Sequence, residues 1–225
     1  MAIFDWNFSG AEREYWRAVE LKPSYVEAYC AIASLLLHER RFDEATAEIR
    51  KVLDLDPVSE VAASYAGTIF LYAGYNQEAI EMYTRALEMD PTSAFNIGNR
   101  GLARVRAGMV AEGVKELASV ADIRVPSFMN DLAYAYARAG MTKELKRLLE
   151  ELLKEARCKP ELAIAVASAY ANLGNTQKAI KWLEKAYDSR LAYLPEANSD
   201  FVFDAIRSNP RFKSLMRRMG FENVG

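Results

Sequence analysis

A chain of 225 residues with 51% hydrophobic and 27% charged side chains can bury a substantial core and is too apolar for a disordered protein. Its 29 basic and 31 acidic residues nearly balance, so the concentrated positive charge that a nucleic acid would require is missing. The start of the chain does not resemble a signal peptide, and no apolar run approaches the roughly 18 residues of a membrane span, which together predict a cytoplasmic protein without membrane partners.

The N-terminal segment, residues 1–25, begins with a short apolar cluster made of Ile3, Phe4, Trp6 and Phe8. Ala11, Tyr15 and Ala18 then follow helical spacing, which predicts one helix. Too few residues precede this helix for a partner helix to form, so the segment corresponds to half of a two-helix unit. We expect its apolar cluster to form an exposed edge.

A period of 34 residues organises the chain after this segment. Prolines recur at Pro23, Pro57 and Pro91, small residues recur at Ala11, Ala45, Ala79 and Gly113, and turn glycines recur at Gly74, Gly108, Gly140 and Gly174. Between these markers the apolar residues of each unit follow helical spacing in two runs. A polar turn separates the first run from the second, and a proline ends the second. The predicted units occupy 26–59, 60–93, 94–125, 126–159 and 160–193.

Over nearly its whole length the sequence resembles the tetratricopeptide-repeat family. That family has a small residue in each first helix, as at Ala33, Gly67, Gly101, Ala133 and Ala167 here, and another early in each second helix. Small residues at these positions let the two helix backbones approach closely. The resemblance implies an all-α fold, a right-handed superhelix of helix pairs whose first helices line a concave groove.

The last segment, residues 194–225, departs from the repeat and is predicted to be a helical cap. Asn209 is a good N-cap, Pro210 suits a first helical turn, and Gly220 is a natural stop. Repeat arrays need an atypical last unit to cover the apolar face of the final pair. The segment also resembles the end of the C-terminal repeat regions in bacterial signalling and regulatory proteins.

The residues that could carry chemistry indicate no enzyme, no metal site and no cofactor. Cys30, Ser34 and His38 share one helix face, but a hydrolytic site also needs an orienting residue and an oxyanion site, and neither is indicated. One histidine and two distant cysteines, Cys30 and Cys158, do not make a metal-ligand set. We expect both thiols to be free and mostly buried.

The resemblance implies that a protein or peptide partner of unknown identity binds on the concave face. Aromatic anchors beside Arg and Asn suit an extended or helical peptide, and their substitution is expected to weaken binding with little effect on stability. The groove positions of the family fall on Tyr72, Phe95, Asn99, Arg106, Asn130, Tyr134 and Arg138.

Two functions remain open at this point. The first is a scaffold that binds a peptide or partner protein in its groove. The second is a regulatory or self-association module of a larger signalling or transcription-regulating protein, which the incomplete first repeat supports. We expect the edge formed by Ile3, Phe4, Trp6 and Phe8 to pair in a homodimer rather than fold back, because Asp5 and Asn7 interrupt so short a helix.

Overall fold

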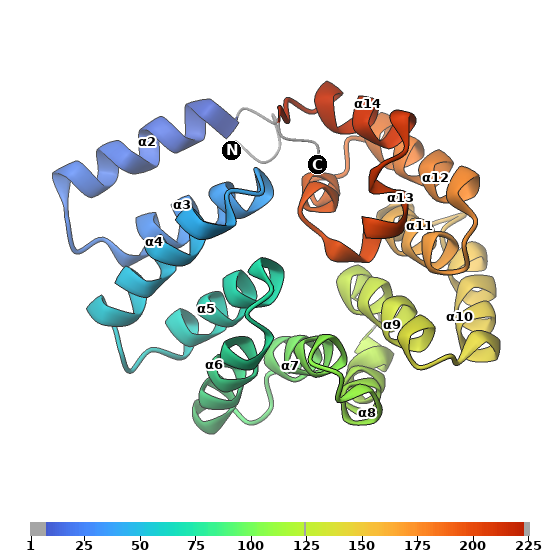
Figure 1. Ribbon diagram of the computed structural model, residues 1–225, viewed down its shortest axis with the longest axis horizontal. Helices are drawn as coiled ribbons and strands as arrows, with labels where there is room; N and C mark the ends of the chain where they lie inside the picture. The colour runs from blue at the N-terminus through green and yellow to red at the C-terminus, as the bar shows by residue number, and fades with distance from the viewer. Residues whose placement is uncertain (1–7, 124, 223–225) are drawn as a thin grey trace.

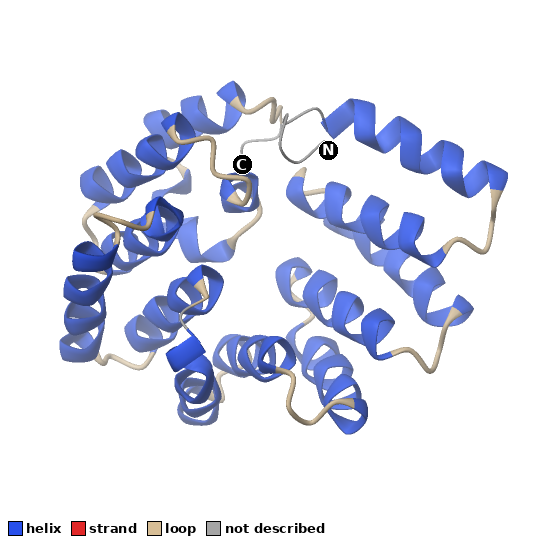
Figure 2. Ribbon diagram, turned by 180° about the vertical axis from the view of Figure 1, so that it is seen from behind, coloured by secondary structure: helices blue, strands red, loops and turns tan. Residues whose placement is uncertain are grey.

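The computed structural model describes residues 8–123 and 125–222, and within these ranges it consists of helices joined by short turns, without strands (Figure 2). The predicted all-α fold is therefore confirmed. None of the helices in these ranges is both long enough and apolar enough to cross a membrane. The first described helix, α2 (Phe8–Leu21), is the single helix of the predicted half repeat.

Five helix pairs follow in the described residues, and each lies within the bounds of one unit predicted from the sequence, four of 34 residues and one, 94–125, of 32. They are α3 (Val26–His38) with α4 (Phe42–Leu55), α5 (Glu60–Ala73) with α6 (Asn76–Met89), α7 (Ala94–Arg106) with α8 (Val110–Val120), α9 (Pro126–Arg138) with α10 (Thr142–Glu155), and α11 (Ala163–Asn172) with α12 (Thr176–Asp188). Short 3-10 turns, η1 (Ala121–Ile123) and η2 (Pro160–Leu162), precede α9 and α11.

The small residues of the repeat bring paired helices into close contact, most clearly between α7 and α8. A Cβ atom on Gly113 would overlap the carbonyl oxygen of Gly101, and a Cβ atom on Gly101 would lie 2.9 Å from the carbonyl oxygen of Gly113. The two backbones therefore touch where the sequence has glycine on both sides. No larger side chain fits there without moving a helix.

One turn of the array breaks the glycine rule. Four pairs are joined through a glycine with positive φ, but the turn between α3 and α4 has Arg40 with φ of 63° instead. A side chain in this left-handed region costs on the order of 1–2 kcal/mol, so a compensating contact is expected. Arg40 makes one, because its Nη1 donates to the carbonyl oxygen of Asn198 at 3.3 Å.

The helix pairs are arranged around a ring, with α3, α5, α7 and α9 toward the inside and their partner helices outside (Figure 1). The first described helix, α2, lies near the C-terminal elements in this view. One apolar core runs through the repeats. A second core joins the last pair and the cap to Phe8 of α2 and Leu35 of α3.

The C-terminal cap closes this ring. It consists of η3 (Leu194–Asn198), η4 (Phe201–Phe203), α13 (Asp204–Arg207) and α14 (Pro210–Arg218). Helix α14 packs on the final pair and buries Phe212 and Met216. The η3 turn instead reaches the first pair, where Asn198 Nδ2 donates to the carbonyl oxygen of His38 at 2.8 Å. The cap thus contacts both ends of the array.

Phe8 corrects the expectation of an exposed N-terminal edge. Its ring stacks on Phe221 of the same chain with centroids 4.8 Å apart, and only 5% of the residue is exposed. At this position the chain folds back on itself because the cap brings Phe221 across to α2. Ile3, Phe4 and Trp6 lie outside the described residues, so the homodimer stays a prediction that concerns those three.

Candidate partner-binding site

The concave face divides into two halves with different surroundings. Along α5 the side chains that are not buried follow one stripe, from Val61 and Tyr65 in the first turns to Tyr72 in the last. We call the first-turn part the open half, defined by Val61, Tyr65 and Phe95. The covered half is defined by Tyr72 and Arg106, in the last turns of α5 and α7, and by Asn130 and Tyr134, in the second and third turns of α9.

The covered half holds the side chain of Phe201 from the cap. The Phe201 ring centroid lies 5.4 Å from that of Tyr72 and 5.2 Å from that of Tyr134. The Arg106 guanidinium lies 3.8 Å from the same centroid, and its Nη1 donates to the carbonyl oxygen of Leu71 at 2.9 Å. These distances are those of aromatic pairs and of a cation–π contact. Phe201 therefore occupies a cage built by three helices.

The residue before Phe201 is held by the amide of Asn130. Asn130 Nδ2 donates to Asp200 Oδ2 at 3.0 Å and to Asp131 Oδ1 at 3.3 Å, and the backbone N–H of Val202 donates to Asp200 Oδ1 at 2.9 Å. All three polar side chains, Asn130, Asp131 and Asp200, are buried. One amide thus bridges two carboxyl groups inside the ring.

Burial raises the pKa values of the carboxyl groups around this contact. Desolvation raises the pKa of Asp200 to about 6, and desolvation together with the nearby charge of Asp200 raises the pKa of Glu196 to about 7. The pKa of Asp131 is raised well above its usual range for the same two reasons. A buried carboxylate that lacks a full countercharge is unfavourable, so the cap is held less firmly when these groups are charged.

The covered half corrects the expectation that its four residues are free for a partner. Tyr72, Arg106, Asn130 and Tyr134 all contact the chain's own cap, so substitution at Tyr72 or Arg106 is expected to lower stability, contrary to the expectation from sequence. The sequence reasoning missed Asp200 and Phe201 as groove contacts. Their only signal was the aromatic run 201–203 inside a segment interpreted as an end cap.

The open half presents large apolar side chains on a rigid base. Val61 is 57% exposed, Tyr65 43% and Phe95 49%, and they come from neighbouring helices α5 and α7. Beneath them, Asn96 Nδ2 donates to Glu60 Oε1 at 2.7 Å and the Ser64 hydroxyl donates to Asn96 Oδ1 at 2.7 Å. This hydrogen-bonded group ties α5 to α7 and fixes the spacing of the apolar side chains.

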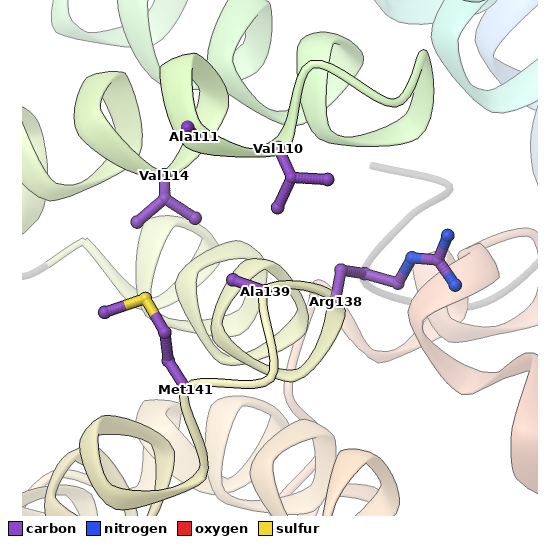
Figure 3. Close-up of a pocket in the computed structure, with 6 residues that line it drawn as sticks. All are labelled: Val110, Ala111, Val114, Arg138, Ala139 and Met141. Atoms are coloured by element: carbon purple, nitrogen blue, oxygen red, sulfur yellow. The ribbon is translucent and has the colours of Figure 1, made fainter.

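The other two predicted groove residues, Asn99 and Arg138, lie outside the open half, and their role in partner binding stays a prediction. Asn99 is buried, and its Nδ2 donates to the carbonyl oxygen of Phe95 within α7 at 2.9 Å. Arg138 is exposed at the edge of an open pocket of about 500 Å³ between α8 and the turn after α9. Figure 3 shows Val110, Val114 and Met141 around this pocket while the Arg138 guanidinium extends away from them.

The face shared by Cys30, Ser34 and His38 is not arranged as a nucleophile with its base. The Ser34 hydroxyl donates to the carbonyl oxygen of Cys30 at 2.9 Å. Burial raises the pKa of the Cys30 thiol to about 11 and lowers the pKa of His38 to about 4, so the thiol stays protonated and the imidazole neutral near pH 7. Both cysteines are free, but Cys158 is exposed rather than buried as expected.

The buried acidic residues do not form a metal site either. Across residues 8–123 and 125–222, no group of three or more His, Cys, Asp or Glu side chains is placed to hold a metal ion. The concave face thus presents exposed apolar side chains in the open half and an aromatic cage, occupied by Phe201, in the covered half.

Comparisons with known proteins agree with the repeat fold. Three family models described as tetratricopeptide repeat match residues 26–59, 66–95 and 113–193. The structure of PilW, described as a widely conserved type IV pilus biogenesis factor, is 16% identical over 88% of this chain and 90% of its own, with a TM-score of 0.60. A tetratricopeptide repeat protein from Parabacteroides merdae is 14% identical over 96% and 88%, with a TM-score of 0.57. The comparison with curated protein sequences found no match.

Proposed function

The chain belongs to the tetratricopeptide-repeat family and is a protein–protein interaction scaffold, and we propose that it binds a peptide segment of its partner on the open half of the concave face. One observation carries this proposal. Val61, Tyr65 and Phe95 are large apolar side chains that stay between 43% and 57% exposed on a surface where their neighbours are buried. Grouped exposed apolar side chains usually mark a contact site.

The polar base of the open half supports the same function. Because Glu60, Ser64 and Asn96 hydrogen-bond to one another across α5 and α7, the apolar anchors above them are presented at a fixed spacing. Preorganised anchors lose little conformational entropy when a partner binds, which favours affinity. An extended or helical segment with two or three apolar side chains fits this chemistry.

The regulatory or self-association module stays a second prediction, and so does a location in the cytoplasm. The fold is typical of scaffolds that carry no catalytic site of their own. No contact among the described residues favours that alternative over the scaffold.

A library of displayed peptides selected on the immobilised full chain tests the proposed site. We expect the selected peptides to bind the Tyr65→Ala and Phe95→Ala variants about tenfold or more weakly, because truncating an anchor typically costs 1.4 kcal/mol or more. Leu55→Ala is the matched control, since Leu55 is similarly exposed, at 44%, but lies at the end of the outer helix α4. Equal binding by all three variants would exclude the open half as the binding surface.

A further inference from the structure

Four of the seven positions predicted to bind a partner are engaged by two consecutive residues of the same chain. Asn130 donates to the carboxyl group of Asp200, while Tyr72, Arg106 and Tyr134 surround the ring of Phe201. The contacts come from helices α5, α7 and α9 of three successive repeats. The covered half is thus a complete recognition site for an acidic residue followed by an aromatic residue.

We propose that the covered half is a second partner-binding site, that it recognises a peptide segment containing Asp–Phe, and that the chain's own Asp200–Phe201 occupies it until such a partner displaces it. This inference rests on the proposed function, because it assigns a partner chemistry to another part of the same concave face. Each element of the site has one role. Asn130 donates a hydrogen bond to the acidic side chain, and Tyr72, Arg106 and Tyr134 contact the aromatic ring.

The cap segment has the properties of an exchangeable ligand. Arg207 holds it from within the cap: Nη2 donates to the carbonyl oxygen of Asp200 at 2.7 Å, and Nη1 donates to that of Asn198. These bonds do not involve the repeats, so the segment can keep its local shape outside the groove. By contrast, the segment is bonded to the repeats through the carboxyl group of Asp200, which accepts from Asn130 and is buried next to the carboxyl group of Asp131.

Phe201 and Phe203, the two aromatic residues of the segment, have different contacts. Phe203 is fully buried and packs toward Phe212 of the cap, with ring centroids 6.5 Å apart. Phe201 points to the repeats instead. A peptide that competes for the covered half therefore needs the aromatic side chain at the position of Phe201 and not at that of Phe203.

The test uses the full chain and a fluorescein-labelled peptide with the sequence of residues 197–204, followed by fluorescence anisotropy. The intramolecular segment competes at an effective concentration in the millimolar range, so the wild-type chain is expected to bind the peptide weakly. In the Phe201→Ala variant the internal competitor loses its anchor. We expect this variant to bind the peptide about tenfold more tightly or better, because the binding-competent fraction rises.

Two matched peptides check the specificity. Replacing the residue equivalent to Phe201 with Ala should weaken binding about tenfold or more, whereas the same replacement at Phe203 should change it by less than about threefold. Adding Arg106→Ala to the Phe201→Ala protein should abolish the gain. If the two altered peptides bind alike, or if no peptide binds the Phe201→Ala chain, the proposal is wrong.

Far-UV circular dichroism confirms that the variants are folded before binding is measured. Should Phe201→Ala fail to fold, Phe201→Leu removes the aromatic ring while filling most of the cage and gives the same comparison. The outcome is separable from that of the proposed function. If binding of the displayed peptides depends on Phe95 but the labelled peptide does not bind, only this inference is contradicted. If the labelled peptide binds as expected but the displayed peptides do not depend on Phe95, only the proposed function of the open half is contradicted.

Discussion

Substitutions at two arginines of the cap can measure how much the hydrogen bonds that hold the segment around Asp200 contribute to the free energy of unfolding, because one arginine is buried and the other is exposed. Arg207 and Arg211 each donate three hydrogen bonds, Arg207 to the carbonyl oxygens of Asn198 and Asp200 and to the side chain of Asp204, and Arg211 to Glu184 and Gln177. Arg207 is 7% exposed, whereas the side chain of Arg211 is 49% exposed. Replacing each with Met keeps most of the apolar stem and removes the bonds.

Burial decides the expected magnitudes. A hydrogen bond from a charged donor contributes about 1.5–3 kcal/mol when it is protected from water, so the two bonds to buried carbonyl groups predict a loss of about 3 kcal/mol in the free energy of unfolding for Arg207→Met. The bond to Asp204 adds little because that side chain is 62% exposed. Arg211→Met removes only a surface pair and is expected to cost about 0–1 kcal/mol.

Urea denaturation followed by far-UV circular dichroism measures both variants. In a chain of this size about 3 kcal/mol corresponds to a fall of roughly 6–12 °C in Tm, which a thermal scan resolves easily. The reasoning fails if the two variants lose the same stability. It also fails if Arg207→Met loses less than about 1 kcal/mol, because the segment inside the ring would then not depend on its buried clamp.

Three further predictions concern the interior, the helix contacts and the N-terminus. The free energy of unfolding of the wild type, measured relative to that of Asp200→Asn, should rise by about 1.4 kcal/mol as the pH falls from 7 to 5. The reason is that the pKa of Asp200 is about 6 in the folded state and 3.8 ordinarily, so protonation favours the folded state. If urea denaturation gives the same difference between the two proteins at both pH values, this carboxyl group is solvated. Gly113→Ala should lower the free energy of unfolding by about 1–3 kcal/mol through overlap with Gly101, and a loss within error would mean that α7 and α8 are further apart. Phe8→Asp should remove the contact with Phe221 and cost about 3 kcal/mol without changing the sedimentation coefficient, whereas a change in that coefficient would favour the homodimer.

The repeat pattern could predict the helices because each marker acts locally. Glycine at Gly74 supports a left-handed turn, and Pro57 ends α4 after Leu55, whatever the rest of the chain does. The small residues at Gly101 and Gly113 likewise follow from one helix pair alone. Such features need only residues that are close in sequence, so the fold class could be predicted from the sequence.

The interior of the ring could not be predicted in this way, because it depends on the summed curvature of all repeats. Nothing near Phe201 in the sequence indicates that it reaches Tyr72 or Arg106, which lie far away along the chain. One local signal did exist. Arg40 stands where the other turns have glycine, and an unfavourable local conformation often indicates a distant contact, here the bond to Asn198.

The bond between Asn198 and His38 joins residues 160 positions apart and has a consequence for folding kinetics. In an open array every contact is made between neighbouring repeats, so its relative contact order is low and its terminal helices fray independently. In the unfolded chain, bringing together the ends of so long a flexible segment would cost about 4–5 kcal/mol in loop-closure entropy, so this contact is not expected to form before the repeats. We expect the repeats to form first and the cap to seal the ring in a slower last step. Once sealed, α2 and α14 should exchange their amide hydrogens at rates set by global rather than end unfolding.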